Sequence, residues 1–283
     1  MSLGLRYMLA STFFFSMMSV LVKIGGEVCG FESAQLVFAR SFVALWLSGW
    51  ALRRQKIAFW KTPHRKLLLL RGVLGFIGLN CFFYAVTKLP LADATVIQYM
   101  NPVFVTVLAA IFLKERFRLW GIVGLICCLS GVLCMAQPSF LFGSSRLELF
   151  PVLVASCGAV LSAGAYTTVR ALRGRAEPML VVFYFPLVAT PLSLPAAWPV
   201  WVWPDWLGWC ILIGVGVVTQ IAQVFMTRGL HLEEASRATM MTYLQVVFAF
   251  FWGVLFFGEV PTLLSGVGSL LILCGALLIV IKR

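Results

Sequence analysis

The sequence predicts an all-α integral membrane protein with ten transmembrane helices, built as two inverted repeats of five helices (5+5). Three observations support this fold class. Of the 283 residues, 61% are hydrophobic and only 11% are charged, which leaves too few polar side chains to cover a water-soluble protein of this size. Apolar runs of about 20 residues, the length that crosses the hydrocarbon core of a bilayer, recur along the whole chain. The second half of the chain also repeats residues of the first half at a constant offset.

Ten apolar runs give the expected helices, and short polar segments separate them. In chain order the runs are 3–24, 32–52, 67–88, 92–113, 119–137, 149–171, 178–198, 206–229, 237–257 and 263–281. The first run has one early basic residue, Arg6, and then a long apolar stretch, but no small-x-small cleavage site follows, so we expect a retained helix and not a signal peptide. The runs are rich in Leu, Phe and Gly without strict alternation, which argues against β-barrel strands.

The net charge of +12 is distributed unevenly along the chain. Basic residues gather in alternate connections, at 53–66, 114–118, 170–175 and 228–237, and at the carboxyl end. This is the positive-inside pattern of membrane proteins, so we expect both termini in the cytoplasm and a multi-pass protein of the inner or plasma membrane. The excess of basic residues then indicates contact with membrane lipid, and nucleic acid is not expected as a partner.

The repeat is clearest in two stretches that lie 144 residues apart. ATVIQYMNPVF at 94–104 and ATMMTYLQVVF at 238–248 share Ala, Thr, Tyr, Val and Phe at equivalent positions. We therefore expect one unit at 1–140 and a second at 141–283. Because five is an odd number, the second unit has to enter the membrane from the opposite side, and inverted repeats of this kind are typical of secondary transporters. The loops agree, because 53–66 carries six basic residues and its counterpart 199–205 carries none.

The chain resembles the EamA branch of the drug/metabolite transporter superfamily. The resemblance rests on PLADATVIQYMNPVFVTVLAAIFLKE at 90–115 and on the glycine-spaced fifth and tenth helices, and it covers essentially the whole chain. The stretch 71–104 is most similar to bacterial carriers of riboflavin and S-adenosylmethionine and to metazoan citrate-type relatives. Membership implies a central cavity lined by the first, third, fourth, sixth, eighth and ninth helices, with the fifth and tenth packed outside.

Polar side chains inside the expected helices are candidates for substrate binding, because polar groups in lipid are costly unless they are paired or face a wet cavity. For a single Ser or Thr, a hydrogen bond between helices is the simpler interpretation. Tyr, Gln and Asn need more room and more partners, which favours a cavity. The candidates are Ser16, Asn80, Tyr84, Gln98, Tyr99, Asn101, Tyr166, Gln220, Gln223, Tyr243 and Gln245. Aromatic and amide groups together suit a flat, polar-edged ligand such as a nucleobase or flavin.

Charged residues at or within the helices allow two kinds of role. Arg40, inside the second helix, either binds a substrate carboxylate or phosphate, or caps helix ends and pairs with Glu27 or Glu32. Asp93, Glu115 and Glu259 are expected to be structural latches. We expect Asp93 to cap the fourth helix at its amino end and each Glu to cap the helix that follows it.

Pro102 distinguishes the first copy of the repeated stretch from the second, which has Val246 at the equivalent position. Proline lacks an N–H group and crowds the carbonyl four residues earlier, so we expect a kink beside Gln98, Tyr99 and Asn101, with Pro102 as a hinge. The ninth helix should run straighter. Tyr99 and Tyr243 should face each other across the axis that relates the repeats.

An enzyme is not expected, because His64 and His231 are the only histidines, and neither metal-ligand spacing nor a nucleophile motif occurs. No cofactor or metal is expected either. The predicted function is a secondary transporter that moves a small ring-containing, nucleotide-like or vitamin metabolite by alternating access. The alternatives are an exporter of amino acids or small carboxylates and a channel-like facilitator. We expect a monomer or weak dimer.

Overall fold

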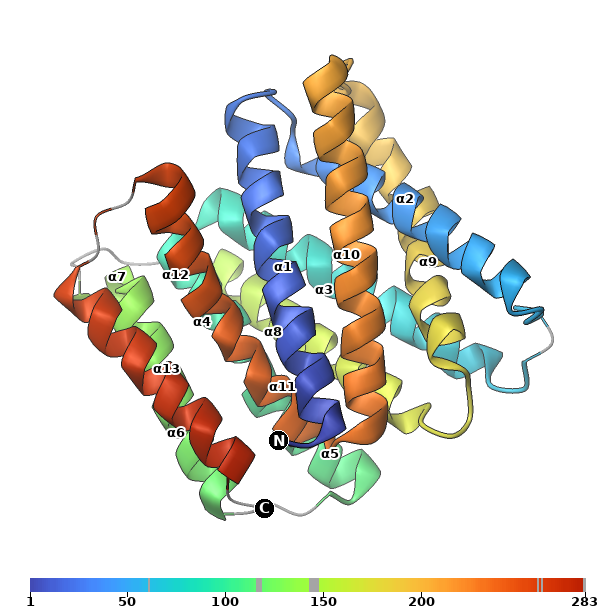
Figure 1. Cartoon of the computed structure of the whole chain (residues 1–283). Helices are drawn as coiled ribbons and strands as arrows, with labels where there is room; N and C mark the ends of the chain where they lie inside the picture. Colours follow the sequence, from blue (N-terminus) through green and yellow to red (C-terminus); the bar gives the residue numbers. More distant parts are fainter. Residues whose placement is uncertain (61, 116–118, 143–147, 259, 261, 282–283) are drawn as a thin grey trace.

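The computed structural model of the chain consists of α-helices joined by short connections (Figure 1). It describes residues 1–60, 62–115, 119–142, 148–258, 260 and 262–281. Within these ranges ten helical spans are long and apolar enough to cross a membrane, and no strand occurs. Each predicted run has a helical span whose ends lie at most three residues from the predicted ends. The predicted all-α membrane fold is therefore confirmed.

Residues up to Phe142 form seven helical segments, and the residues from Leu149 onward form the remaining ones. The first set is α1 (Leu3–Glu27), α2 (Ser33–Arg54), α3 (Arg65–Lys88), α4 (Leu91–Gln98), α5 (Asn101–Leu113), α6 (Leu119–Ala136) and α7 (Ser139–Phe142). The second set is α8 (Leu149–Ala171), α9 (Pro178–Ala197), η1 (Trp198–Val200), α10 (Trp206–Leu232), α11 (Ala235–Met240), η2 (Met241–Tyr243), α12 (Leu244–Phe257) and α13 (Leu263–Ile281). The fourth and ninth spans are thus composed of more than one segment.

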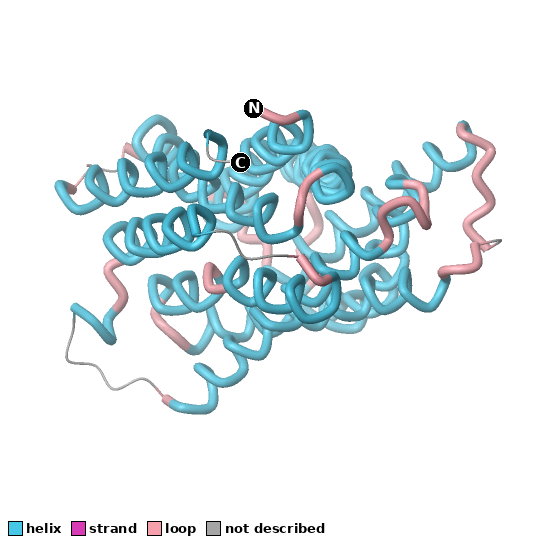
Figure 2. Tube along the Cα trace, turned by 90° about the horizontal axis from the view of Figure 1, so that it is seen from below, coloured by secondary structure: helices cyan, strands magenta, loops and turns pink. Residues whose placement is uncertain are grey.

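The helices pack in pairs that join the two parts of the chain. At one edge of the bundle α6 packs on α13, and at the other edge α2 packs on α9. Between these edges α1 packs on α10 and α3 packs on α8 (Figure 1). Both chain termini lie at one end of the bundle, seen from below in Figure 2. We call the end of the bundle where α1 begins and α13 ends the terminal end. We call the other end of the bundle the opposite end.

Glycines allow α6 and α13 to approach closely. A Cβ atom added at Gly131 would lie 2.6 Å from the Gly268 carbonyl oxygen, and one added at Gly275 would lie 2.7 Å from the Gly124 oxygen. Any larger residue would push the two helices apart, as in other small-residue membrane interfaces. Gly124 faces Gly275 and Gly131 faces Gly268, so the two helices run antiparallel.

Glu115 has two hydrogen-bond partners, and they differ from those expected. Its Oε1 accepts a hydrogen bond from Nε of Arg170 at 3.0 Å, and its Oε2 accepts one from the N–H of Ala235 at 2.8 Å. It therefore caps α11, not the helix that follows it. The reason is a left-handed turn at Lys114 (φ 55°), which ends α5 and leaves Glu115 beside the cation at the end of α8.

Asp93 also binds a different element from the one predicted. Pro90 is the N-cap residue of α4, and Asp93 lies in the first turn of that helix. Its carboxylate accepts hydrogen bonds from the N–H of Ser139 at 2.7 Å and from the Ser139 hydroxyl. Asp93 therefore holds the start of α7 at the opposite end. Glu259 lies outside the described residues.

Candidate functional site

The fourth span is interrupted next to Pro102, as the sequence predicts. Helix α4 ends at Gln98 and α5 begins at Asn101. The N–H of Val103 bonds to the carbonyl of Met100 at 3.0 Å, so it does not reach the carbonyl of Tyr99 in the usual helical pattern. The Tyr99 carbonyl instead accepts a hydrogen bond from the hydroxyl of Tyr243 at 2.9 Å. The break thus provides a backbone acceptor in the interior of the bundle.

The ninth span is also irregular, although its helical residues run on without the gap that separates α4 from α5. A 3-10 turn, η2, separates α11 from α12. The hydroxyl of Thr239 bonds back to the Ala235 carbonyl at 2.8 Å, and that of Thr242 bonds to the Thr239 carbonyl at 2.6 Å. Such back-bonding by Ser and Thr bends helices and favours tightened turns. In the ninth span, the side chains of Thr239 and Thr242 thus accompany a local change in helix geometry. In the fourth span, the change occurs at the Asn-Pro pair.

Tyr99 and Tyr243 meet where these two irregular spans approach each other. Their ring centroids lie 6.0 Å apart with an interplanar angle of 29°, an offset arrangement that aromatic rings prefer. Tyr243 is fully buried, whereas Tyr99 is only half-buried. The expectation that the two rings face each other is confirmed, and Tyr99 keeps part of its surface open to the interior space.

Arg71 is the most informative residue that the sequence reasoning missed. It is 3% exposed, its guanidinium lies 4.5 Å from the centre of the Phe185 ring, and its Nη2 donates to the Gln223 amide oxygen at 3.2 Å. Its Nε and Nη1 atoms are buried and have no hydrogen-bond partner in the described part of the chain. The signal was available: Arg71 follows four leucines inside α3, where a cation is expensive unless it has a function.

Arg40 is the second buried guanidinium and lies on α2. It is 9% exposed, and its Nη1 contacts the sulfur of Met18 at 3.8 Å. Among the described residues, no hydrogen bond or ion pair joins it to a helix end, to Glu27 or to Glu32.

Arg40 and Arg71 belong to one electrostatic cluster together with two tyrosines. Tyr166 lies within electrostatic range of both guanidinium groups and of Tyr99, and Arg71 lies within range of Arg40. Within the described ranges, neither arginine forms an ion pair with a carboxylate. Two buried like charges without counterions are costly, and an anion placed between them would lower that cost. We name Arg40, Arg71, Tyr99, Tyr166 and Gln223 the arginine cluster.

The other candidates differ in whether their side chains already have partners. The Asn101 amide donates to the carbonyl of Ala159 at 3.1 Å and so joins α5 to α8. Gln220 on α10 is buried, and its amide oxygen has no partner among the described residues. Gln98 and Gln245 are half-buried. The unpaired oxygen of Gln220 makes it the stronger substrate candidate of this group.

Asn80 and Tyr84 are not brought to the arginine cluster. Asn80 is exposed on α3, and its amide bonds back to the Phe76 carbonyl at 2.8 Å. It lies nine residues after Arg71, which at about 100° per residue places it on the opposite side of the helix. Tyr84, also exposed, packs against Phe150. The sequence grouped them correctly on one face but did not reveal that this face points outward.

A cavity of about 460 Å³ opens in the half of the bundle that lies away from the termini. Ser16 lines it, and the Ser16 hydroxyl accepts a hydrogen bond from Nε1 of Trp252 at 2.9 Å. Other lining residues come from the last turns of α1 and α12, from Thr95 in α4 and from Ser265 in α13. Thr95 lies one turn before Tyr99, so the cavity approaches the level of the helix break.

These features match a known family. The sequence model of the EamA-like transporter family matches residues 2–137 and again residues 149–281. The chain therefore belongs to the EamA-like transporter family, and it is a multi-pass protein of the plasma membrane. The family and the relatives below are transporters, which agrees with the expectation that the chain is not an enzyme.

Two curated relatives and one solved structure illustrate the match. The pseudopaline exporter CntI of Pseudomonas aeruginosa (strain UCBPP-PA14) is 35% identical over 270 residues, which cover 95% of this chain and 93% of that protein. Solute carrier family 35 member G1 of Mus musculus is 30% identical over 295 residues, covering 99% and 79%. A crystal structure with 17% identity superposes with a TM-score of 0.83 over 97% of this chain and 95% of that one. The last comparison shows a shared fold.

Proposed function

We propose that the protein is a secondary transporter that moves a small organic anion by alternating access. The observation that carries this proposal is the arginine cluster, in which two buried guanidinium groups have no carboxylate partner among the described residues. A charged substrate oxygen would accept charge-assisted hydrogen bonds from the free Nε and Nη1 atoms of Arg71. Without a bound anion, the two buried positive charges of the cluster have no counterion, which is unfavourable. Binding of an anion there is therefore favoured over binding of a neutral molecule.

The substrate class we place first is a ring-containing, nucleotide-like or vitamin anion. Tyr166 is half-buried within electrostatic range of both guanidinium groups, and Tyr99 is half-buried within range of Tyr166. A flat ligand that enters this region would stack on the ring of Tyr166. The amides of Gln220 and Gln223 would bind the polar edge of such a ring. A pseudopaline exporter among the relatives supports the movement of an organic metabolite, with export as the direction.

A small carboxylate or an amino acid is the second candidate. Two guanidinium groups suit a compound with more than one carboxylate, whether or not it contains a ring. A channel-like facilitator is less favoured, because the cavity at the opposite end does not continue to the terminal end, where Glu115 and Arg170 join three helices.

The proposed mechanism uses two inverted repeats, 1–140 and 141–283, that rock about the site. Antiparallel packing of α6 on α13, and the contact of Tyr99 with its counterpart 144 residues later, support this symmetry. Pro102 serves as the hinge of the fourth span. We place both termini in the cytoplasm from the distribution of basic residues, and we propose a monomer or weak dimer.

A thermal-shift screen of the purified protein tests the substrate class. A ligand that binds the folded state raises the apparent melting temperature. We expect flavin mononucleotide to stabilise the protein more than neutral riboflavin does, because only the former carries a phosphate. If citrate and glutamate stabilise it and no ring compound does, the second candidate replaces the first. If riboflavin and its phosphate are equivalent and the acids have no effect, the anion proposal is wrong.

A variant pair then tests the arginine cluster itself. Arg71→Gln should weaken binding of the anion roughly 10- to 100-fold, because a hydrogen bond to a charged group contributes about 1.5–3 kcal/mol. Arg173→Gln removes the same charge from an exposed position and should leave affinity unchanged. Saturable counterflow in proteoliposomes would separate a carrier from a channel. Equal loss of affinity in both variants would contradict a specific role for Arg71.

A further inference from the structure

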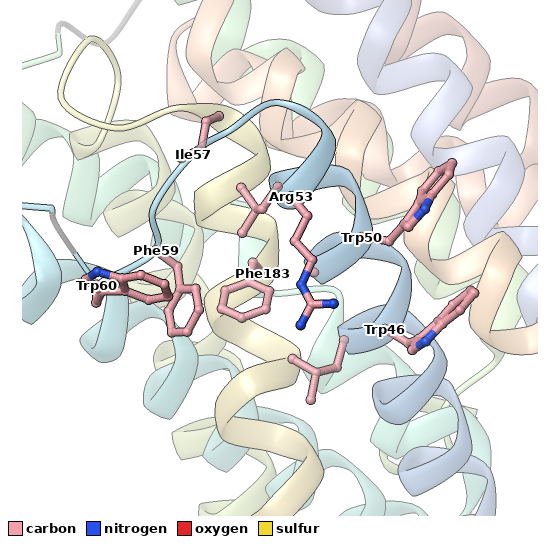
Figure 3. A pocket seen from close by; sticks show the side chains of 10 residues that line it. Trp46, Trp50, Arg53, Ile57, Phe59, Trp60 and Phe183 are labelled. Atoms are coloured by element: carbon pink, nitrogen blue, oxygen red, sulfur yellow. The ribbon is translucent and has the colours of Figure 1, made fainter.

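A groove lies at the carboxyl end of α2 and is distinct from the cavity that Ser16 lines. It has a volume of about 480 Å³ and is lined by aromatic and aliphatic side chains with one charged group, Arg53. Figure 3 shows Arg53 between two aromatic walls, with Trp46 and Trp50 on one side and Phe59 and Trp60 on the other. Phe183 of α9 also lines the groove.

The second wall is held in place by a specific turn and two contacts. Lys56 adopts a left-handed conformation (φ 55°), its N–H bonds to the Arg53 carbonyl at 3.1 Å, and the N–H of Ile57 bonds to the Leu52 carbonyl at 3.0 Å. These two hydrogen bonds form a Schellman motif, which ends α2 and reverses the direction of the chain. The Phe59 carbonyl then accepts a hydrogen bond from the Tyr184 hydroxyl at 2.8 Å, which fixes the segment against α9.

Three tryptophans around the groove are strongly exposed. Trp46 is 67% exposed, Trp50 is 49% exposed and Trp60 is 60% exposed. Exposed tryptophans of membrane proteins lie at the level of the lipid headgroups, where the indole is partly apolar and partly hydrated. The guanidinium of Arg54 lies 4.2 Å from the centre of the Trp50 ring and so helps to orient this wall. The groove is therefore placed at the membrane interface.

The surroundings of the groove select a negatively charged occupant. The segment 53–66, which begins at the groove, contains six Lys or Arg residues and neither Asp nor Glu. Arg53 is exposed, and within the described ranges it forms no ion pair. Guanidinium groups bind phosphate oxygens in a bidentate geometry, and basic residues next to a transmembrane helix attract anionic lipids.

The outer face of α2 matches the length of an acyl chain. Phe42, Trp46 and Trp50 lie at intervals of four residues on one exposed stripe that ends at Arg53. The helical rise from Phe42 to Arg53 is roughly 16 Å. This is about half of the 30 Å hydrocarbon core, which is the depth of one leaflet. A chain that starts at a phosphate on Arg53 would thus reach Phe42.

The geometry points to a binding site for an anionic glycerophospholipid, with its phosphate on Arg53 and one acyl chain along the stripe of Phe42, Trp46 and Trp50. The site joins α2 to α9, so a bound lipid stabilises the contact between the two parts of the chain at this edge. It does not depend on the transport substrate or on the arginine cluster.

Lipid-dependent melting of the purified protein tests this proposal. We expect phosphatidylglycerol in mixed micelles to raise the apparent melting temperature more than phosphatidylcholine does. Arg53→Gln should remove most of that difference, and Arg173→Gln, an exposed arginine at the same end of the bundle, should keep it. Glycerol 3-phosphate and inorganic phosphate should have no effect, because they lack the acyl chain. Equal stabilisation by both lipids, or an unchanged response of Arg53→Gln, would overturn the proposal.

A cross-linking experiment on the unmodified sequence removes any dependence on the variants. Phosphatidylglycerol with a photoactivatable acyl chain should label peptides that contain residues 42–60. Competition with unlabelled phosphatidylglycerol should reduce this labelling more than competition with phosphatidylcholine. Labelling spread evenly over other lipid-facing helices such as α13, with no preference for one competitor, would show that the groove has no selectivity.

Discussion

The two ends of the bundle differ in how they are closed. At the terminal end, Arg170 binds Glu115 at 3.0 Å and Arg237 binds Glu233 at 3.1 Å. These side chains are nearly buried, and Arg170 also donates to the carbonyls of Leu230 and His231. At the opposite end, the helices diverge around a cavity of about 460 Å³. In the described part of the chain, ion pairs therefore hold the terminal end together, whereas a cavity lies at the opposite end.

This difference indicates which contacts have to change during a transport cycle. Ion pairs that are nearly buried hold the sealed end firmly only while both partners are present, because a lone buried charge is costly. A transporter needs a second conformation in which the terminal end opens. Glu115 is the residue on which that step depends most, because it binds both Arg170 of α8 and the amino end of α11.

The largest effect is expected from Glu115→Gln. The substitution leaves Arg170 nearly buried without its counterion, which should cost about 3 kcal/mol of stability in the sealed conformation. The measurement is the apparent melting temperature in detergent. Glu177→Gln at the same end, whose side chain makes no capping hydrogen bond, is the control and should melt like the unsubstituted protein. If both variants melt alike, Glu115 does not hold the terminal end together.

A smaller loss is expected from Asp93→Asn at the opposite end. The amide can accept only one of the two hydrogen bonds from Ser139, and the charge-assisted component disappears. We expect a loss of about 2 kcal/mol in unfolding free energy. Glu32→Gln, an exposed residue at the same end without a side-chain cap, should have no effect. If Asp93→Asn lost more unfolding free energy than Glu115→Gln, the opposite end and not the terminal end would contribute more to stability, which would contradict the comparison.

Tyr243→Phe tests the contact between the two irregular spans. The Tyr99 carbonyl would lose its hydrogen bond from the Tyr243 hydroxyl, which should cost about 1 kcal/mol. Tyr99→Phe is the matched control, because it removes the equivalent hydroxyl but keeps that bond, and it should melt normally. Equal destabilisation of both variants would mean that ring packing and not the hydrogen bond carries the contact.

The smallest effect on stability is expected from Pro102→Val, which copies the residue of the second repeat. The substitution restores a backbone N–H group that can bond to the Gln98 carbonyl, so the gap between α4 and α5 should close. We expect a change in unfolding free energy below about 1 kcal/mol and a slower counterflow rate in proteoliposomes. An unchanged rate would show that the break is not a hinge.

The sequence was sufficient to predict the ten spans and the break at Pro102, because lipid imposes helix length and proline imposes its own geometry. It was also sufficient to pair Tyr99 with Tyr243, which occupy equivalent positions in the two similar stretches. It was not sufficient for the ninth span, where side-chain hydrogen bonds of Thr239 and Thr242 tighten the helix.

The candidate site was predicted less completely than the fold. Arg71 was missed although it follows four leucines inside an expected span, and the packing of α3 against α9 and α10 shows that it is buried. Asn80 has the right chemistry but points away from Arg71, and helix rotation does not follow from composition. The partners of Glu115 and Asp93 come from other parts of the chain, so neighbouring residues could not reveal them. The substrate-binding and hinge roles stay predictions.

Hydrogen exchange of the unsubstituted protein and of Glu115→Gln tests the central claim that the two ends open in alternation. The unsubstituted protein should exchange slowly in peptides covering 228–240 and faster in peptides covering 16–23 and 246–257, which line the cavity. In Glu115→Gln the terminal-end peptides should exchange faster and the cavity peptides more slowly, because opening one end closes the other. Faster exchange at the terminal end with no change at the opposite end would contradict the account.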